Sequence, residues 1–257
     1  MDKIALMNEA WKAAMVGTSP VERGRAKERD ALLWLWRWGW SSATTTDLAV
    51  SNRRGIVKRL VDRKLIKYYD TEGLRELYYP PRVIILTQAG IDCLGEKYDL
   101  SELRKPTAEH VAWHQLRHDH AAQFWTAKKI NEGVIKDYFT PREMARKSTN
   151  GAKQPDVIWI MPDGSKIGLE IELTYKKAYE KHMMVSKMTA LLESGTVDSI
   201  IIVTRSEATA QEFLRLIAPG AVRARWRRWQ RKYELVDGVD DVAPGWLIDK
   251  ITIELLP

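Results

Sequence analysis

The pattern of apolar and polar residues in the second half of the chain predicts strands and helices in alternation. Two apolar runs, 157–161 and 166–173, flank the turn sequence Pro162-Asp163-Gly164 and predict a β-hairpin. Beyond the hairpin, the pattern predicts helices over 177–192 and 207–217 and strands over 197–203 and 251–255. This order is typical of an α/β fold with a mixed sheet.

Shorter patterns fill the first half of the chain. Residues 1–24 hold an amphipathic segment that ends at the break Gly17-Thr18-Ser19-Pro20, and we expect an arm or an extra helix there. The following pattern predicts helices over about 27–38, 44–50 and 51–65, a hairpin from 65–68 and 76–79, and a strand with a closing helix over 83–94. These elements predict one unit over residues 25–100.

The third of these helices combines an apolar stripe with a basic face. Its apolar positions are Ile56, Val57, Leu60 and Val61, and the cations on or near the other side are Arg53, Arg54, Lys58 and Arg59. The order of helix, helix, basic helix and hairpin, with the ending Leu86-Thr87-x-x-Gly90-x-x-x-Leu94, resembles bacterial winged helix-turn-helix domains. The resemblance implies that the cations contact DNA phosphates and that the basic helix reads base edges. A winged helix that binds protein is the alternative.

Four tryptophans lie at every second position where the first long helix ends. They are Trp34, Trp36, Trp38 and Trp40. A helix repeats every 3.6 residues, so no single face can bury residues with this spacing. We therefore expect some of these indoles to be partly exposed, in a core that extends into a domain or dimer interface, with base stacking as the alternative.

A polar stretch separates the two halves, and a cluster of histidines follows it. Residues 97–107 are polar and end in Pro106-Thr107, which predicts a domain boundary with Thr107 capping the next helix. That helix carries histidines at i, i+4 and i+8 with two further polar residues beside them: His110, His114, His118, Asp119 and His120. Imidazoles one turn apart can chelate a metal, but they can equally line a catalytic cleft or serve the structure, and His114 and Asp119 are the candidates for function.

Three carboxylates are predicted to converge on the hairpin of the second half. Asp156 opens the first strand. Because side chains alternate along a strand, Glu170 and Glu172, two residues apart on the second strand, are predicted to lie on the same face. Carboxylates gathered in this way repel one another unless a hard cation such as Mg²⁺ or Mn²⁺ lies among them. Lys176, just beyond the strand, is placed to neutralise charge on a phosphate. The alternative is a set of solvated acids on the outer face of a hairpin.

Pro155-Asp156, a spacer and Glu170-Ile171-Glu172 resemble the PD-(D/E)XK superfamily of nucleases. The resemblance covers about 106–257 and implies a restriction-endonuclease-like α/β domain with a mixed sheet behind the N-terminal winged helix-turn-helix. It implies Asp156 and Glu170 as ligands of Mg²⁺ or Mn²⁺, Glu172 as a further metal ligand or as an activator of water, and an accessory acid, Glu109 or Asp119, on the preceding helix. The usual motif lysine is replaced by Glu172, so the cation comes from one of four lysines: Lys176, the nearest, or Lys177, Lys181 or Lys187.

A narrower resemblance joins several short motifs of the second half. The motifs are His114-Gln-Leu-Arg-His-Asp119, Thr140-Pro141-Arg142-Glu143, Pro155-Asp156 and Glu170-Ile-Glu172-Leu-Thr-Tyr-Lys176. Together they resemble MobC-type plasmid relaxases and the related replication-relaxation proteins. This implies a metal-dependent enzyme that nicks one strand at a plasmid transfer origin. The alternatives are a restriction-like or transposition endonuclease that cuts both strands, and a DNA-binding regulator whose nuclease domain is inactive. A covalent link through Tyr138 or Tyr175 stays open.

A second basic segment lies near the C-terminus. Residues 223–232 combine six cations with Trp226 and Trp229. Such a mixture suits a phosphate backbone with stacking or cation–π contacts to an unpaired base, with Arg225 and Arg228 as candidate contacts. The alternative is a solvated basic helix whose tryptophans pack inward.

Composition narrows the setting of these sites. The formal net charge of +7 indicates a polyanionic partner, and 45% hydrophobic residues suffice for a core. We expect double-stranded DNA as the partner, single-stranded DNA at a nick, and either a homodimer or accessory mobilisation proteins. The single cysteine, Cys93, rules out an internal disulfide framework and is expected to fill the core. Without an eighteen-residue apolar run or a signal-peptide core, a cytoplasmic location with no membrane partner is predicted.

Overall fold

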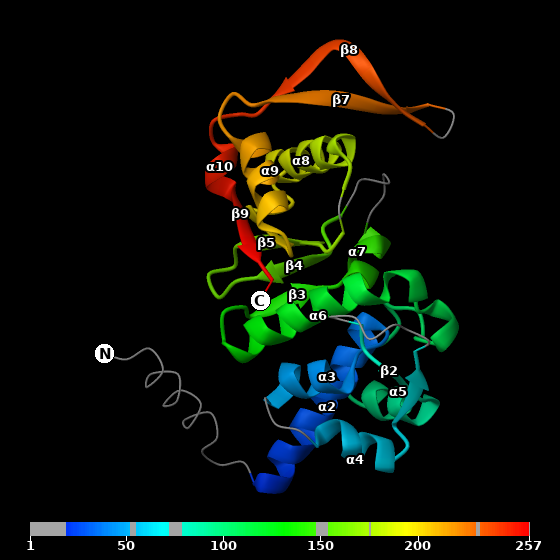
Figure 1. The fold of residues 1–257 in the computed structure, drawn as a ribbon. Coiled ribbons are helices and arrows are strands. Elements are labelled where there is room, and N and C mark those ends of the chain that lie inside the picture. The colour runs from blue at the N-terminus through cyan, green and yellow to red at the C-terminus, as the bar shows by residue number, and fades with distance from the viewer. Residues whose placement is uncertain are drawn as a thin grey trace.

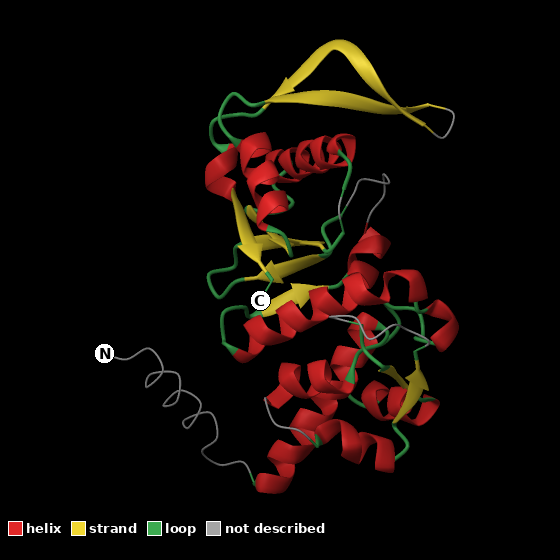
Figure 2. Cartoon of the chain, viewed as in Figure 1, coloured by secondary structure: helices red, strands yellow, loops and turns green. Residues whose placement is uncertain are grey.

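The computed structural model describes residues 19–51, 55–71, 79–147, 154–174, 176–229 and 232–256. Helices dominate the first half of the chain, and the strands of a central sheet lie in the second half (Figures 1 and 2). The prediction of an α/β chain with a mixed sheet is confirmed. Among the helices of these ranges, none has the length and apolarity needed to cross a membrane.

The described residues of the first half form four helices and a small antiparallel sheet. The elements are α2 (Pro20–Trp38), α3 (Ala43–Ser51), α4 (Ile56–Asp62), β1 (Ile66–Asp70), β2 (Arg82–Leu86) and α5 (Gln88–Gly95). A capping box of Ser19 and Glu22 starts α2, and Gly39, with φ of +87°, ends it. Side chains at Gly90 are excluded, because a Cβ there would overlap the carbonyl oxygen of Leu65. This contact explains the glycine of the Leu-Thr-x-x-Gly ending.

Two helix boundaries in the first half differ from the prediction. The basic helix predicted over 51–65 is the shorter α4, Ile56–Asp62, because Ser51 ends α3 and Gly55, with φ of +114°, precedes α4. The first long helix begins at Pro20 rather than near residue 27, because Ser19-Pro20 forms its N-terminus instead of a break. The strand β1 pairs with β2, from Ile66 with Leu86 to Asp70 with Arg82. Of the predicted hairpin partner 76–79, only Tyr79 lies within the described residues. Residues 1–18, 52–54 and 72–78 lie outside the described ranges, so the predicted arm and hairpin turn stay predictions.

The expectation that some of the four tryptophans are exposed was wrong. Each is at most 5% exposed: Trp34, Trp36, Trp38 and Trp40. α2 is enclosed on more than one side, by α3, α4 and α5 and also by α7 (Pro141–Lys147). Trp40 follows the helix end, so its side chain does not share the helical repeat. A helix wrapped by neighbours can bury positions that a helix lying on one surface would expose.

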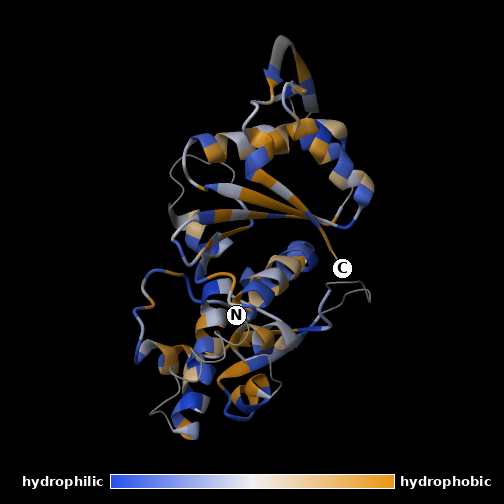
Figure 3. Cartoon of the chain, turned by 90° about the vertical axis from the view of Figure 1, so that its left-hand side faces the viewer, coloured by the Kyte–Doolittle hydropathy of each residue, from blue (hydrophilic) through white to orange (hydrophobic). Residues whose placement is uncertain are grey.

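The second half is a five-stranded sheet with helices on both faces. Its strands are β3 (Asp137–Phe139), β4 (Val157–Ile160), β5 (Lys166–Glu172), β6 (Ser199–Thr204) and β9 (Ile251–Leu255), in the order β3-β4-β5-β6-β9. β3, β4 and β5 are antiparallel neighbours, while β5, β6 and β9 run parallel. The predicted hairpin is therefore confirmed as β4 and β5, and the last strand completes the sheet. In Figure 3 these strands are mainly in the hydrophobic colour.

Alternation along the strands divides the core into two layers. Leu169 and Ile171 of β5 pack with α6 (Leu116–Asn131), while Ile200 and Ile202 of β6 pack with α8 (Ala178–Glu193) and α9 (Glu207–Ile217). The predicted helices over 177–192 and 207–217 are confirmed. The α6 layer continues into the core of the first half through Trp34, Trp38 and Trp125. Packing is thus continuous between the two halves, and the predicted boundary at 97–107 lies on irregular chain beside it.

Two further predictions of helices were wrong. The histidine segment is not one helix but two 3₁₀ turns, Ala108–His110 and Trp113–Gln115, followed by α6. The alternative of a helix over 223–232 is also wrong, because this segment forms β7 (Val222–Trp229), which pairs antiparallel with β8 (Lys232–Val242). These strands make a separate two-stranded ribbon that projects beyond α8, and the short α10 (Leu247–Lys250) leads from it back to β9 (Figure 1).

Candidate active site at the end of β5

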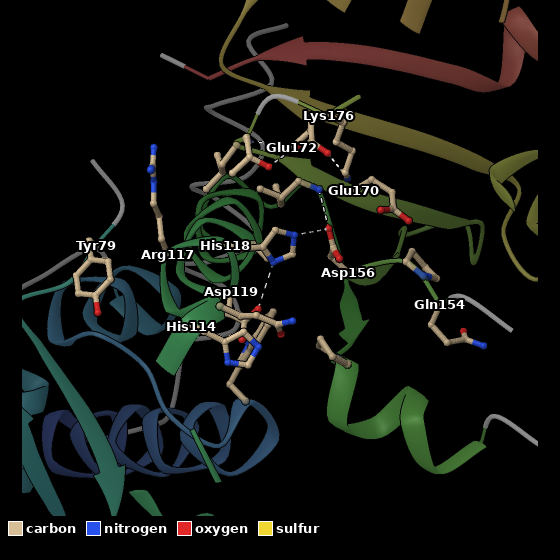
Figure 4. A pocket seen from close by; sticks show the side chains of 18 of the residues that line it. Tyr79, His114, Arg117, His118, Asp119, Gln154, Asp156, Glu170, Glu172 and Lys176 are labelled. Carbon is tan, nitrogen blue, oxygen red and sulfur yellow. Dashed lines mark hydrogen bonds and ion pairs between the residues drawn. The ribbon is translucent and has the colours of Figure 1, made fainter. Parts of the chain in front are cut away.

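A cavity of about 880 Å³ opens where β5 ends, between α6, α7 and the loop that leads to α8. All six residues that the sequence singled out for catalysis line it: His114, Asp119, Asp156, Glu170, Glu172 and Lys176. They come from three separate segments of the chain. Figure 4 shows Glu172 and Lys176 on one side of the cavity, His114 and Asp119 on the other, and Asp156 between them.

The two glutamates of β5 are buried at the wall of the cavity. Glu170 and Glu172 are each 2% exposed, and the alternate residues Leu169 and Ile171 pack into the α6 layer. Glu172 forms an ion pair with Lys176 and accepts hydrogen bonds from the backbone N–H and the hydroxyl of Thr174, each at 3.1 Å. The expectation of one shared face therefore holds for both glutamates, and the lysine nearest the motif is the one that pairs with Glu172.

A histidine links the carboxylates on the other side of the cavity. His118 lies with its Nε2 3.1 Å from Oδ2 of Asp156 and its Nδ1 3.2 Å from Oδ1 of Asp119 (Figure 4). The same Oδ2 accepts the backbone N–H of Ile171 at 2.7 Å. Burial acts to lower the pKa of His118, but the hydrogen bonds to Asp119 and Asp156 outweigh it and raise this pKa to about 10. The imidazole is therefore a cation at neutral pH that joins α6 to the start of β4.

His118 belongs to the predicted row of histidines, but His114 was the histidine predicted to have a function. In the structure His114 is exposed at the cavity wall, whereas His118 makes the contacts. His110 lies outside this cavity, beside the hydroxyl of Thr107. His120 is 9% exposed and structural, because its Nε2 lies 2.9 Å from hydroxyls of the first half. The signal for His118 was its place next to Asp119, but spacing alone cannot show which imidazole reaches Asp156.

The other lysines considered for the site lie elsewhere. Lys181 is 3% exposed and pairs with Glu212, while Lys177 and Lys187 are exposed on α8 or at its start. The alternative accessory acid, Glu109, is exposed in the first 3₁₀ turn. Of these candidates, Lys176 alone lines the cavity.

The cavity collects side chains of the kind that bind hard cations, but these side chains are not arranged as a metal site. Within the described ranges, no group of three or more His, Cys, Asp or Glu side chains is placed to hold a metal ion. The cavity nevertheless collects four carboxylates, from Asp119, Asp156, Glu170 and Glu172. Carboxylate oxygens are the ligands that Mg²⁺ and Mn²⁺ prefer. Asp156, Glu170 and Glu172 thus fit such an ion by chemistry, with the imidazolium of His118 already compensating Asp156.

The predicted DNA contacts are divided between described and undescribed positions. Lys58 is exposed on α4, and Arg59 is 53% exposed while its Nε lies 3.0 Å from Oε1 of Glu28. Arg225 is exposed on β7. Arg53, Arg54 and the side chain of Arg228 lie outside the described set, so their role stays a prediction.

One of the two tyrosines considered for a covalent link is buried in the core. Tyr138 is 5% exposed, stacks on Trp38 and lies under the guanidinium of Arg37, and burial raises the pKa of its hydroxyl. These contacts belong to the core and to the link between α2 and β3. Tyr175 lies outside the described residues.

No protein-family model, curated protein or solved structure matches the chain.

Proposed function

We propose that the protein is a metal-dependent DNA endonuclease that nicks a phosphodiester bond, of the PD-(D/E)XK type and similar to MobC-type relaxases. One observation carries the proposal: residues chosen from three distant segments for nuclease chemistry line a single cavity. Two of them, Glu170 and Glu172, are buried carboxylates, which cost free energy to bury and are retained where function needs them.

The residues have separate roles in this proposal. Asp156, Glu170 and Glu172 hold Mg²⁺ or Mn²⁺, which when bound supplies a Lewis acid and lowers the pKa of water. Glu172 also accepts the proton of the attacking water, and Lys176, at the same wall, stabilises negative charge that develops on the phosphate. His118 and Asp119 fix the orientation of Asp156 from α6. His114, exposed at the wall, contacts the DNA backbone.

We assign DNA selection to the first half of the chain, as a winged helix-turn-helix. The order α2, α3, α4, β1 and β2, with a bridge between Ser41 and Ile84, supports this assignment. Lys58 and Arg59 of α4 would face the duplex, together with Arg53 and Arg54 of the segment before it, and the +7 net charge is consistent with a polyanion in the cytoplasm. Close packing of α3 against α6, within a core that both halves share, would hold the two proposed functions in a fixed relative position.

A second function, a DNA-binding regulator without catalysis, is favoured by the charge pairing inside the cavity. His118 joins Asp119 and Asp156, and Lys176 pairs with Glu172, so protein cations already compensate most of the carboxylates. An inactive scaffold would retain such pairs.

Plasmid cleavage distinguishes the two functions. Supercoiled plasmid DNA from the native host would be incubated with Mg²⁺, Mn²⁺ or EDTA and with wild type, Asp156→Asn, Glu170→Gln or the exposed control Glu193→Gln. We expect open-circle product that needs the metal, persists in Glu193→Gln and disappears in the other variants. Linear product would indicate a double-strand endonuclease. Salt-sensitive DNA binding without any cut would support the regulator.

A further inference from the structure

The ribbon of β7 and β8 is fixed to α8 by a buried arginine. Arg223 is fully buried, with Nη1 donating to the hydroxyl of Thr189 at 2.9 Å and Nη2 lying 2.9 Å from Oδ1 of Asp241. The next backbone N–H, of Ala224, donates to Nδ1 of His182 at 3.0 Å. These contacts anchor the base of the ribbon on the middle of α8.

An aromatic cluster lies farther out along the ribbon, at the first turn of α8. The ring of Tyr179 stacks on Tyr233 of β8 with centroids 4.8 Å apart, and its centroid is 5.6 Å from that of Trp226 of β7. Tyr233 remains 39% exposed. A bulge between Ala224 and Trp226 re-aims β7 at this point, so that Trp226 turns toward α8. The three rings form a partly exposed surface, which we call the aromatic platform.

The platform lies close to Lys176, at the wall of the cavity. Lys176 lines the cavity, and Tyr179 follows it by three residues, so their Cα atoms are at most about 11 Å apart. One strand of B-DNA advances about 3.4 Å per phosphate, so about three nucleotides cover this distance. A strand that leaves the cavity toward the start of α8 therefore reaches the platform within about three nucleotides.

Charge around the platform favours a nucleic-acid strand. Lys177 at the start of α8 and Arg225 on β7 are exposed, and the sequence of the ribbon tip adds further cations. Two acids lie nearby: Glu180, which accepts the backbone N–H of Lys177 in the helix cap, and Glu234 on β8. Flat rings beside exposed cations are the arrangement that binds unpaired bases without reading their sequence.

We infer that the aromatic platform of Tyr179, Trp226 and Tyr233 binds single-stranded DNA that leaves the cavity, stacking its bases and holding the unpaired strand. This inference rests on the proposed function, since it supplies the path of the strand near the nick. Anchoring alone does not need the platform, because Arg223 and His182 already attach the ribbon.

The test measures binding in EDTA, so it does not depend on cleavage. An oligothymidylate that carries 2-aminopurine reports stacking by fluorescence quenching, and anisotropy gives the affinity for it and for a duplex of equal length. In Tyr179→Leu/Tyr233→Leu we expect single-strand affinity to fall at least about fivefold and the quenching to be lost, with duplex affinity unchanged. Tyr179→Phe/Tyr233→Phe, which keeps the rings, and Trp246→Leu, which removes an exposed ring elsewhere, should bind as wild type does.

The outcomes separate this inference from the proposed function. If the double leucine variant does not fold, Tyr233→Leu alone is used, because that ring is exposed. Unchanged single-strand binding in the leucine variant, or equal losses for single strand and duplex, would overturn the platform even if the protein cuts DNA. Selective loss of single-strand binding in a protein that never cuts would keep the platform and refute the endonuclease.

Discussion

The carboxylates on the two sides of the cavity are compensated by different cations. On the α8 side, Glu172 is 2% exposed and is compensated by its ion pair with Lys176. On the α6 side, Asp156 and Asp119 keep side-chain exposures of 19% and 27% and share His118, which can lose its proton. The buried carboxylate of Glu172 is thus paired with a lysine, and the partly solvated carboxylates of Asp119 and Asp156 share a histidine.

This difference indicates which side the chemistry depends on. Removing a partner from a buried charge leaves it without compensation, whereas water can replace a partner near the surface. We therefore expect changes on the α8 side to have large effects on both cleavage and stability. Changes on the α6 side should be smaller and should depend on pH.

Cleavage should show the largest contrast between the sides. Glu172→Gln removes a proposed metal ligand and proton acceptor, so the nicking rate should fall by at least about 100-fold. Asp119→Asn acts on Asp156 only through His118, and its loss should be about tenfold. Single-turnover nicking at saturating protein gives both values, with Glu193→Gln as the control. If the nicking rate falls equally in the two variants, the two sides of the cavity do not differ in their importance for cleavage.

Stability should follow the same order. Lys176→Met leaves Glu172 buried without its cation, so the free energy of unfolding should fall by about 3 kcal/mol. Neutralising the acid as well, in Glu172→Gln/Lys176→Met, should restore most of it. Urea unfolding in EDTA measures both variants. If the double variant is as unstable as the single one, the loss comes from packing and not from charge.

The His118 bridge should make a smaller contribution that depends on pH. The pKa of His118 is about 10 in the folded chain against an ordinary value of 6.5, so its stabilisation is complete below about pH 6.5 and is lost as pH rises through 10. Because the side chain is 36% exposed, screening limits the effect to about 1 kcal/mol. Wild type and His118→Gln, melted in EDTA, should differ at pH 6 and converge above pH 10. A constant difference across this range would exclude the bridge as its source.

The smallest effect is expected at the rim of the α8 side. Thr174 donates its hydroxyl to Glu172 from an exposed position, so Thr174→Val should lower the unfolding free energy by roughly 0.5 kcal/mol. Its backbone N–H still reaches the same oxygen, and cleavage should change less than threefold. A loss comparable with that of Lys176→Met would show that the hydroxyl, and not the lysine, holds Glu172.

The hairpin and the helices after it could be predicted because their signals are local. The turn Pro162-Asp163-Gly164 fixes the pairing of β4 with β5, and alternation then places Glu170 and Glu172 on one face. α8 and α9 follow from helical repeats that match the layer they bury. These features needed no knowledge of distant contacts.

The errors arose where distant packing decides the local structure. The histidine segment leaves the helical conformation at Val111 and Ala112, where Val111 is 6% exposed and packs with Leu116 and Trp40. The tryptophans of α2 are covered by neighbours that the helical repeat does not encode. The arginine-rich segment forms β7 because it pairs with β8 and because Arg223 finds Asp241 and Thr189. The bridge of His118 depends on two elements 38 residues apart in sequence, from His118 to Asp156.

Binding of Mn²⁺ to the free protein tests the central claim most directly, because it requires neither a DNA target nor turnover. Loss of the electron paramagnetic resonance signal of free Mn²⁺ would be titrated with wild type, Glu170→Gln/Glu172→Gln and Glu193→Gln. We predict a bound ion in wild type and in Glu193→Gln, and weakening by at least about tenfold in the double variant. Equal Mn²⁺ binding by all three proteins, or none in wild type, would contradict a metal site at the end of β5.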